Sequence, residues 1–456
     1  MATTSFSRTS GTPTNALKWT YSVWVKLSEL IDGDRWLLDF NTDSNNRSQI
    51  GWTHDNSLPQ LIVYEKVSSS TSQLFTTTQG FRDLGAFYNI VVSCDRTLAT
   101  QEDRTKIYIN GERVTDFHTT PNYPAQNVTG IINTAVDTLI GKYSQSTVYY
   151  DGLMSYVSFV DGTAYDASYF GETDSSSGIW KIKTVPSVTW GNNGFFLKMD
   201  TSSPGTDTSG NNNTFTASGT PTLTQDNASN NYNILSEVIY ATSAGVTISN
   251  GGTSFNSGSS IDYAFAIPNF ALSKGRWYFE SKIGHTCAGL YIGDTIQIVE
   301  AVRNSTRIGV GSQQYSWECN GNFQNNNTQT SYGSTATAGD VIGMFVDLED
   351  NKLYISVNGT LQNSGTGFAC TDPASTQSGF YFVGGIADQC GATANVTADM
   401  NYGNGFFGTT AVSSSNADAA GYGLFEYSPN QGGAANFDGY AKNFYALNTK
   451  NINTYG

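Results

Sequence analysis

The sequence predicts an all-β protein with two antiparallel β-sandwich domains in tandem. One observation is a hairpin pattern that occurs twice, at residues 105–114 and 351–361, where alternating apolar residues lead into an Asn-Gly pair. Asn-Gly favours the positive φ angles of a two-residue hairpin turn. The composition agrees, because 38% hydrophobic residues can fill sandwich cores and 47 glycines suit short strands joined by tight turns. The length of 456 residues exceeds what one core normally holds, which indicates more than one domain.

The charge content narrows the class of partner. Only 13% of the residues are charged, against roughly 25% in an average soluble protein, so we expect a surface of neutral hydroxyls and amides. The net charge of -15 and the absence of a Lys/Arg cluster argue against nucleic-acid binding. No apolar run is long enough to cross a bilayer, and the first residues lack the pattern of a secretory signal. We therefore expect that the protein is made in a cytoplasm and does not insert into a membrane.

The cysteines show no metal-binding or disulfide pattern. Cys94, Cys287, Cys319, Cys370 and Cys390 are an odd number and include no Cys-x-x-Cys pair. We therefore expect free thiols, as in a reducing compartment.

Residues 1–200 carry an ordered series of predicted strands with alternating apolar side chains. These strands lie at residues 19–27, 35–40, 60–64 and 87–95 before the first hairpin, and at 139–143 and 150–159 after it. A Tyr-Ser-Val-Trp-Val strand, a Tyr-Ile-Asn-Gly hairpin and a Tyr-Asp-Gly-Leu-Met segment follow one another in this order. The order resembles the laminin-G-like, or concanavalin-A-like, family, and this resemblance implies a jelly-roll sandwich.

Residues 232–403 carry a second series of predicted strands. They lie at residues 274–283, 307–311, 339–348, 380–385 and 394–403, and the third of them leads into the second Asn-Gly hairpin. The Gly-Arg-Trp-Tyr-Phe-Glu strand and the Gly-Asp-Val-Ile-Gly-Met-Phe-Val-Asp segment resemble the SPRY domain. This resemblance implies a second β-sandwich.

Two further segments differ in composition from these domains. Residues 201–231 are rich in Ser, Thr, Asn, Gly and Pro, which is typical of a linker with a strand or two. Residues 404–456 contain small and aromatic residues, and we expect them to form a C-terminal extension that packs on the second domain.

Alternation around the two Asn-Gly turns also predicts core residues. For the first core these are Trp24, Val92, Ile107 and Ile109. For the second core they are Tyr278, Val346, Leu353 and Ile355.

The arrangement of a laminin-G-like domain, an Asn/Thr-rich linker, a SPRY-like domain and a C-terminal Tyr-Ala-Leu-Asn-Thr-Lys-Asn segment is similar to structural proteins of marine tailed phages. This resemblance implies a virion protein made in the host cytoplasm and exposed on the particle as a capsid decoration, a knob or a tail-fibre-associated protein. Its expected partners are other virion proteins and host-surface glycans, with several copies or a homo-oligomer on each particle. Two alternatives stay open: a glycoside-hydrolase-like enzyme on the jelly-roll domain, and a SPRY-type adaptor that binds peptides.

Catalytic patterns are missing from the sequence. Retaining glycosidases need two carboxyl groups about 5 Å apart, and no Glu-x-Asp-x-x-Glu type run occurs. Asp39, Asp151 and Asp161 stand singly, and none of the three histidines lies near a serine or cysteine in a pattern typical of a catalytic triad. We therefore expect no enzymatic activity.

The candidate binding residues are of two kinds. Laminin-G-like domains often hold a calcium ion, and Asp39 and Asp151 are the candidate ligands, although both could be ordinary turn aspartates. Sugar binding needs exposed aromatic rings beside polar groups, although buried rings look the same in a sequence. The candidates for ligand binding are Trp52, His54, Asp55, Tyr149, Tyr150, Trp317 and Phe323.

Overall fold

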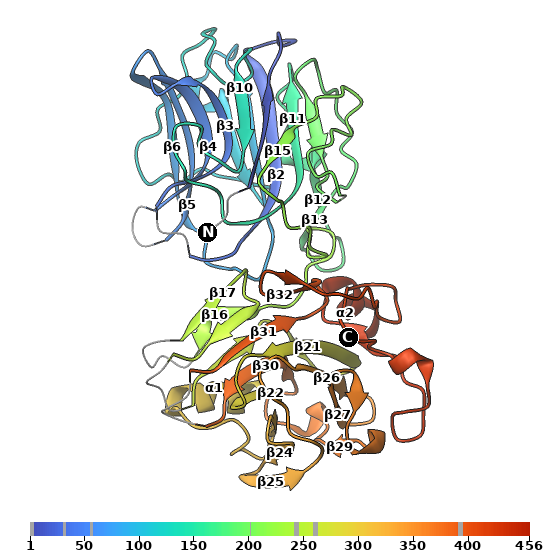
Figure 1. Ribbon diagram of the computed structural model, residues 1–456. Helices are drawn as coiled ribbons and strands as arrows, with labels where there is room; N and C mark the ends of the chain where they lie inside the picture. The colour runs from blue at the N-terminus through green and yellow to red at the C-terminus, as the bar shows by residue number, and fades with distance from the viewer. Residues whose placement is uncertain are drawn as a thin grey trace. The chain divides into compact units, whose positions relative to one another are not determined.

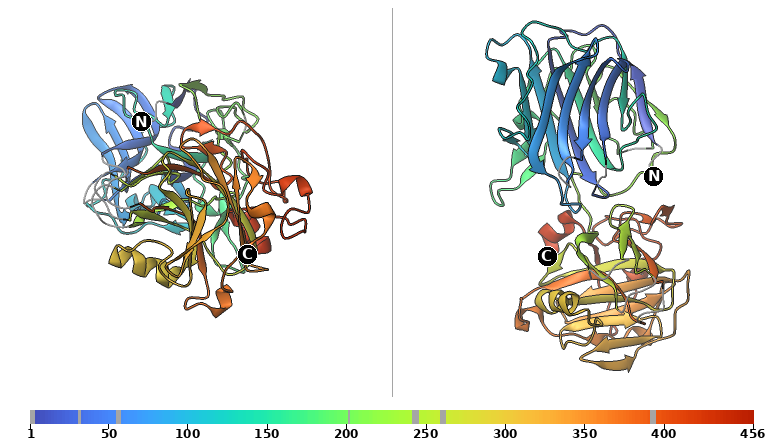
Figure 2. Two further views of the ribbon diagram at one scale, coloured as in Figure 1. Left: turned by 60° about the horizontal axis from the view of Figure 1, so that its bottom comes forward. Right: turned by 90° about the vertical axis from the view of Figure 1, so that its left-hand side faces the viewer.

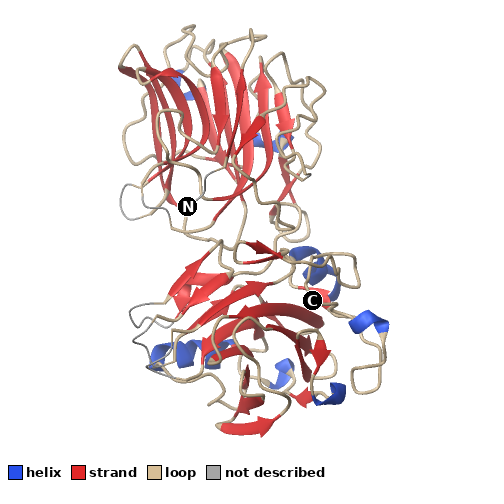
Figure 3. Cartoon of the chain, in the orientation of Figure 1, coloured by secondary structure: helices blue, strands red, loops and turns tan. Residues whose placement is uncertain are grey.

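The computed structural model of the protein describes residues 4–30, 33–54, 58–200, 202–240, 246–258, 263–390 and 395–456. The chain divides into two compact units, residues 1–223 with 227–229, and residues 224–226 with 230–456. Strands dominate both units, as Figures 1 and 3 show. The predicted all-β class with two antiparallel sandwiches in tandem is confirmed.

The first unit contains, within its described residues, a seven-stranded and a six-stranded sheet. The first runs in the order β15 (Thr216–Ser218), β1 (Ser5–Thr9), β10 (Asp137–Ile140), β3 (Arg35–Asp43), β4 (Asn46–Thr53), β5 (Gln60–Val67) and β6 (Ser70–Gly80). The second runs β14 (Phe195–Leu197), β11 (Gly152–Asp161), β2 (Lys18–Leu27), β7 (Tyr88–Asp95), β8 (Thr105–Ile109) and β9 (Glu112–Arg113). Phe40 and Phe159 meet between the two sheets with their ring centroids 5.4 Å apart. Strand β15 comes from the segment expected to be a linker.

The outer face of the six-stranded sheet is covered by the chain that follows it, which includes the small hairpin of β12 (Gly171–Thr173) and β13 (Trp180–Ile182). Val91 and Val160 of the sheet form a buried cluster with Phe170, and Trp180 packs against it. Trp180 Nε1 also donates a hydrogen bond of 3.0 Å to Asn89 Oδ1. Because both faces of the sheet are covered, nearly every residue of β2 is buried.

Both Asn-Gly turns have the predicted conformation. Asn110 and Gly111 have φ angles of 49° and 85°, and Asn358 and Gly359 have 47° and 77°. In each turn the Asn Oδ1 accepts a hydrogen bond from a backbone N–H of the neighbouring strand, from Asn89 of β7 at 2.8 Å in the first unit and from Val341 of β26 (Val341–Asp347) at 2.9 Å in the second. The side chain of each Asn therefore fixes the turn to its own sheet.

An aromatic ring from the following chain lies against each turn glycine. A Cβ atom on Gly111 would lie 2.5 Å from the ring of Trp180, and one on Gly359 would lie 2.4 Å from the ring of Tyr427. Glycine is thus needed at both positions for the turn conformation and for the close approach of a ring.

The second unit also contains two large sheets within its described residues. One consists of β16 (Leu235–Tyr240), β19 (Phe265–Pro268), β30 (Tyr381–Asp388), β22 (Ala288–Asp294), β23 (Gln314–Glu318), β24 (Asn322–Asn325) and β25 (Thr328–Ser331), with β20 (Ala271–Leu272) beside β30. The other consists of β17 (Thr247–Ser249), β18 (Ser254–Asn256), β31 (Thr397–Asn401), β21 (Arg276–Ile283), β26 (Val341–Asp347), β27 (Lys352–Val357) and β28 (Thr360–Leu361), with β29 (Phe368–Ala369) beside β27 and β34 (Tyr445–Ala446) parallel to β21. Besides short 3-10 helices, the described part of this unit also contains α1 (Thr295–Asn304), the hairpin of β32 (Phe406–Phe407) and β33 (Thr410–Ala411), and α2 (Thr449–Tyr455).

Residues 404–447, which we call the strap, pack on the outer face of the sheet that contains β21, β26 and β27. Phe437 and Phe444 of the strap form a buried aromatic cluster with Tyr278, Phe345 and Tyr354 of the sheet. Tyr278 is therefore buried beneath the strap and not in the core between the sheets, where it was predicted. The other predicted core residues of this unit, Val346, Leu353 and Ile355, do lie in the core between the sheets.

One cysteine pair differs from the prediction. Cys287 and Cys390 form a disulfide across a sequence separation of 103 residues, whereas Cys94, Cys319 and Cys370 are free. The expectation that all five are free is wrong because β22 and β30, which these two cysteines flank, are paired neighbours in one sheet. The spacing of cysteines in the sequence does not reveal that pairing.

Candidate functional site

A candidate ligand surface lies on the outer face of the seven-stranded sheet of the first unit. This sheet faces the viewer as blue strands in the right-hand view of Figure 2. The strand register places Asp39 of β3 beside Gln49 of β4, and Gln49 beside Tyr64 of β5. These side chains share one face, because successive residues of a strand alternate between faces. We call the following set the outer patch: Asp39, Arg47, Gln49, Tyr64, Tyr143 and Ser144.

The exposed part of the outer patch is a row of two aromatic rings with a guanidinium between them. The Arg47 guanidinium carbon lies 5.4 Å from the ring centroid of Tyr64 and 5.5 Å from that of Tyr143. Arg47 Nε also donates a hydrogen bond of 3.1 Å to Gln49 Oε1. All three members of the row are partly exposed. The guanidinium covers one face of each ring, so a ligand would contact the exposed parts of the rings and the polar edges that this stacking leaves open.

Beneath this row lies a buried carboxylate that is only partly satisfied. Asp39 is fully buried, and its Oδ2 accepts a hydrogen bond of 3.0 Å from the backbone N–H of Ser144. Among the described residues, Asp39 Oδ1, Gln49 Nε2 and Ser144 Oγ have no hydrogen-bond partner of good geometry. Burial raises the pKa of the Asp39 carboxyl, although Ser144, Gln49 and the Arg47 charge oppose the rise.

The loop of residues 141–150 covers this carboxylate. Lys142 and Tyr149 pair as an isolated bridge, and Gln145 Nε2 donates a hydrogen bond of 3.1 Å to Asn41 Oδ1. Gln145 itself is exposed. The loop is therefore attached to the sheet face by Gln145 and Ser144 and by the stack of Tyr143 on Arg47.

Four of the predicted ligand-binding residues lie in the interior. Trp52, Tyr150, Trp317 and Phe323 are at most 5% exposed. These four are therefore not the exposed rings that sugar binding needs, because each fills space inside its own unit. Trp52, for example, packs against Phe81 with the ring centroids 4.5 Å apart. An aromatic residue in an alternating strand has the same sequence pattern on a covered face as on an open one.

The remaining predicted contacts stay predictions. His54 and Tyr149 are partly buried, and Lys142 Nζ lies 5.1 Å from the ring centroid of Tyr149. Asp55 lies outside the described residues. Sequence reasoning missed Arg47, Gln49, Tyr64 and Tyr143, although alternating polar side chains in β4 mark the open face of this sheet.

The predicted calcium ligands do not fit a calcium ion. Ca²⁺ takes about six to eight oxygen ligands. Asp39 is buried near the Arg47 charge, which opposes a second cation, and Asp151 Oδ1 accepts a hydrogen bond of 3.0 Å from Ser28 Oγ. In the part of the chain that the structure describes, no group of three or more His, Cys, Asp or Glu side chains is placed to hold a metal.

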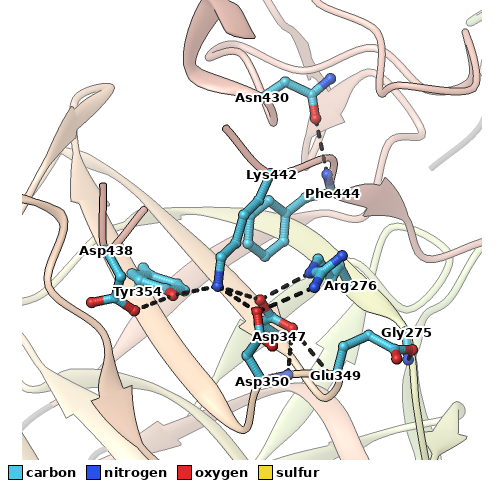
Figure 4. Close-up of polar contacts among 10 residues, drawn as sticks. All are labelled: Gly275, Arg276, Asp347, Glu349, Asp350, Tyr354, Asn430, Asp438, Lys442 and Phe444. Carbon is cyan, nitrogen blue, oxygen red and sulfur yellow. Dashed lines mark hydrogen bonds and ion pairs between the residues drawn. The ribbon is translucent and has the colours of Figure 1, made fainter. Parts of the chain in front are cut away.

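In the second unit, a charged cluster fixes the strap to its sheet (Figure 4). Lys442 Nζ donates hydrogen bonds to Asp347 Oδ2 and Asp350 Oδ2, both at 2.8 Å, and to Tyr354 Oη at 3.0 Å. Arg276 Nε also donates to Asp347 Oδ2, at 2.9 Å. Burial alone would lower the pKa of Lys442, but the bonds to these oxygens outweigh it and raise the pKa. The ammonium group therefore stays charged and acts as an anchor.

A buried glutamate holds a second point of the strap. Glu280 accepts hydrogen bonds from the backbone N–H groups of Glu426 at 2.9 Å and Tyr427 at 2.7 Å. It also accepts from Tyr278 Oη at 2.9 Å and Asn401 Nδ2 at 3.2 Å. Burial raises the pKa of Glu280 to about 7, against these hydrogen bonds, which lower it. The side chain links the sheet to the backbone of the strap.

These features define a protein of two tandem β-sandwiches, each of which covers one sheet face with its own following chain. Residues 2–167 match the model of the concanavalin A-like lectin/glucanases superfamily, and residues 276–426 match that of the SPRY domain. The chain therefore carries a concanavalin A-like domain followed by a SPRY domain. These two domains suggest a role in binding or adhesion.

Solved structures similar to the chain include two that are named as SPRY-type domains and a stonustoxin structure. The SPRY domain of human HERC1 is 14% identical, with a TM-score of 0.27, over 34% of this chain and 91% of that one. The TRIM65 PSpry domain is 12% identical, with a TM-score of 0.28, and the match covers 37% of this chain and 91% of that one. Stonustoxin is also 12% identical, with a TM-score of 0.28, over 37% and 27%. No curated protein matches the chain. No helix among the described residues is long and apolar enough to cross a membrane.

Proposed function

We propose that this chain is a non-enzymatic adhesion protein on the exterior of a tailed-phage virion, and that its first domain binds host-surface glycans. The concanavalin A-like and SPRY domains support the binding role. The similarity of the domain order and of the Tyr-Ala-Leu-Asn-Thr-Lys-Asn ending to marine phage proteins supports the virion setting. Other virion proteins are the proposed partners that attach it as a capsid decoration, a knob or a fibre-associated protein. Multiple copies on one particle would strengthen a weak single contact.

The observation that carries this proposal is the row of Tyr64, Arg47 and Tyr143. A pyranose presents an apolar C–H face, which stacks on an aromatic ring, and hydroxyls, which need hydrogen-bonding groups beside that ring. The row supplies both on a partly exposed face. Because the ligand is neutral, binding should depend on short-range contacts and should tolerate salt.

The outer patch also supports binding without hydrolysis. Its single carboxylate, Asp39, is buried beneath the row, whereas glycosidases use two carboxyl groups on either side of the bond that breaks. We propose that polysaccharides bound there are not cleaved. Release of reducing ends by the wild-type chain and its loss in Asp39→Asn would show a hydrolase instead.

A second candidate function is peptide binding by the SPRY domain, which the match over residues 276–426 favours. The predicted contact residues Trp317 and Phe323 are buried, so a peptide would need other residues of that unit. A peptide library that binds the full chain, with no glycan binding, would support this alternative.

The proposed function is tested with the full chain on a glycan array. We expect a neutral glycan to bind the wild-type chain, and Tyr64→Ala and Tyr143→Ala each to weaken the binding about tenfold, the worth of one stacking contact. Tyr440→Ala is the matched control, because Tyr440 is 69% exposed and belongs to the second unit. Equal binding by all four proteins would place any glycan site elsewhere. Antibody labelling of phage particles tests the virion setting separately.

A further inference from the structure

We propose that Asp39, Gln49 and Ser144 form a hydroxyl-binding site beneath the loop of residues 141–150, and that two neighbouring hydroxyls of a neutral saccharide bind there when this loop lifts. The inference deepens the proposed function and rests on it in one respect, the ligand class. It goes further because it assigns the polar recognition to side chains that are buried in the closed state.

The unsatisfied atoms of this site complement a diol. Asp39 Oδ1 is an acceptor, Gln49 Nε2 is a donor and Ser144 Oγ can be either. All three atoms are buried, and none has a hydrogen-bond partner of good geometry among the described residues, although Gln49 and Ser144 lie close enough to Asp39 to lower its pKa. Asp39 and Gln49 lie opposite each other on β3 and β4. One sugar hydroxyl can therefore donate to the carboxylate while its neighbour accepts from the amide. Other buried polar atoms of the described residues also lack a partner, but here an acceptor and two possible donors gather at one place without good mutual geometry, which is the arrangement that a ligand hydroxyl could complete.

Charged ligands fit this site poorly. An anion would meet the Asp39 carboxylate on a protein whose net charge is already -15. A cation would meet the Arg47 guanidinium, which is held in place by Tyr64 and Tyr143. A neutral sugar avoids both conflicts, and its apolar face can stack on Tyr64, which stays on β5 when the loop lifts.

The loop provides a way in because its polar attachments are few. The side chain of Gln145 donates to Asn41 from an exposed position, and the backbone N–H of Ser144 donates to Asp39. Lifting the loop would break these two bonds and the stack of Tyr143 on Arg47, and it would uncover the carboxylate. A ligand hydroxyl would then replace the lost donor to Asp39.

The test measures binding of glucose, galactose and mannose to the full chain by calorimetry and by saturation-transfer NMR. We expect Asp39→Asn to weaken binding of the preferred hexose about 10- to 100-fold, the worth of a hydrogen bond to a charged group. Gln145→Ala should strengthen it about two- to tenfold, because opening the loop then breaks one neutral hydrogen bond fewer. A merely structural role for Asp39 would not predict this gain. A deoxy analogue that lacks either hydroxyl should bind the wild-type chain no better than the parent sugar binds Asp39→Asn.

The matched control is Asp137→Asn. Asp137 is an exposed carboxylate on β10 of the same sheet, next to Asn41, so the substitution changes the charge equally and should leave binding unchanged. If Tyr64→Ala loses binding while Asp39→Asn does not, the proposed function stands and this inference is wrong. If an array glycan binds the wild-type chain but neither that chain nor Gln145→Ala binds any hexose, this inference alone is wrong, and if no glycan binds in either assay, both are wrong. Crystals soaked in the bound sugar that show only water at Asp39 would also overturn the inference.

Discussion

Gly359→Ala should destabilise the second unit through the strap as well as through the turn. Gly359 has a φ angle of 77°, which costs an alanine about 1–2 kcal/mol. The new Cβ would also lie 2.4 Å from the ring of Tyr427, and overpacking of this kind costs about 1–3 kcal/mol. The expected total is therefore about 2–5 kcal/mol. Gly339→Ala is the control, because Gly339 has a φ angle of 97° but no atom within 4 Å of its Cβ position, so only the first cost applies.

The assay is calorimetric unfolding of the full chain, with the transition of each unit analysed separately. Each kcal/mol should lower the melting temperature of the second unit by about 2–4 °C. In the double variant Gly359→Ala with Tyr427→Ala, the new Cβ no longer overlaps the tyrosine ring. A double-mutant cycle of these two substitutions should therefore give a coupling energy of about 1–3 kcal/mol. Equal losses for Gly359→Ala and Gly339→Ala, with no coupling to Tyr427, would refute the contact between strap and turn.

Three further predictions concern the second unit. Lys442→Met should lower the free energy of unfolding by about 3 kcal/mol in urea titrations, because the buried carboxylate of Asp347 then has one cation fewer beside it. A loss below ~1 kcal/mol would show that the strap does not need this anchor. The raised pKa of Glu280 means that the folded unit binds a proton more tightly than the unfolded chain. The difference in unfolding free energy between the wild-type chain and Glu280→Gln should therefore favour the wild type most in acid. It should fall by roughly 3 kcal/mol as the pH rises from about 4.5 through about 7. A difference that does not change with pH would contradict the argument from burial. Reduction of the disulfide between Cys287 and Cys390 should cost about 4–5 kcal/mol in the same titration, and alkylation of the unfolded, unreduced chain should label three thiols and not five.

The fold could be predicted because its signals are local. The Asn-Gly pairs specify turns through positive φ angles, and alternation specifies which side chains of each strand share a face. Tyr278 shows that alternation predicts the face of a strand but not what covers that face. Alternation assigns it to one face of β21, but the cover on that face comes from Phe437 and Phe444, more than 150 residues later in the sequence.

The candidate site was harder to predict for the same reason. Trp52 is an aromatic residue beside polar ones in the sequence, but it points into the sandwich, whereas Tyr64 on the next strand points out. The outer patch is assembled from β3, β4, β5 and a loop near residue 143, and only the sheet order brings these segments together. The disulfide could not be predicted for the same reason, since Cys287 and Cys390 become neighbours only through strand pairing.

The central claim is that the outer patch binds a neutral glycan through stacking and hydrogen bonds. Its most direct test is a calorimetric titration of the best array glycan into the full chain and into Tyr64→Ala, at low and at high salt. We predict that the wild-type affinity is nearly independent of salt and falls about tenfold in the variant. An affinity that drops steeply with salt, or one that Tyr64→Ala leaves unchanged, would contradict the account.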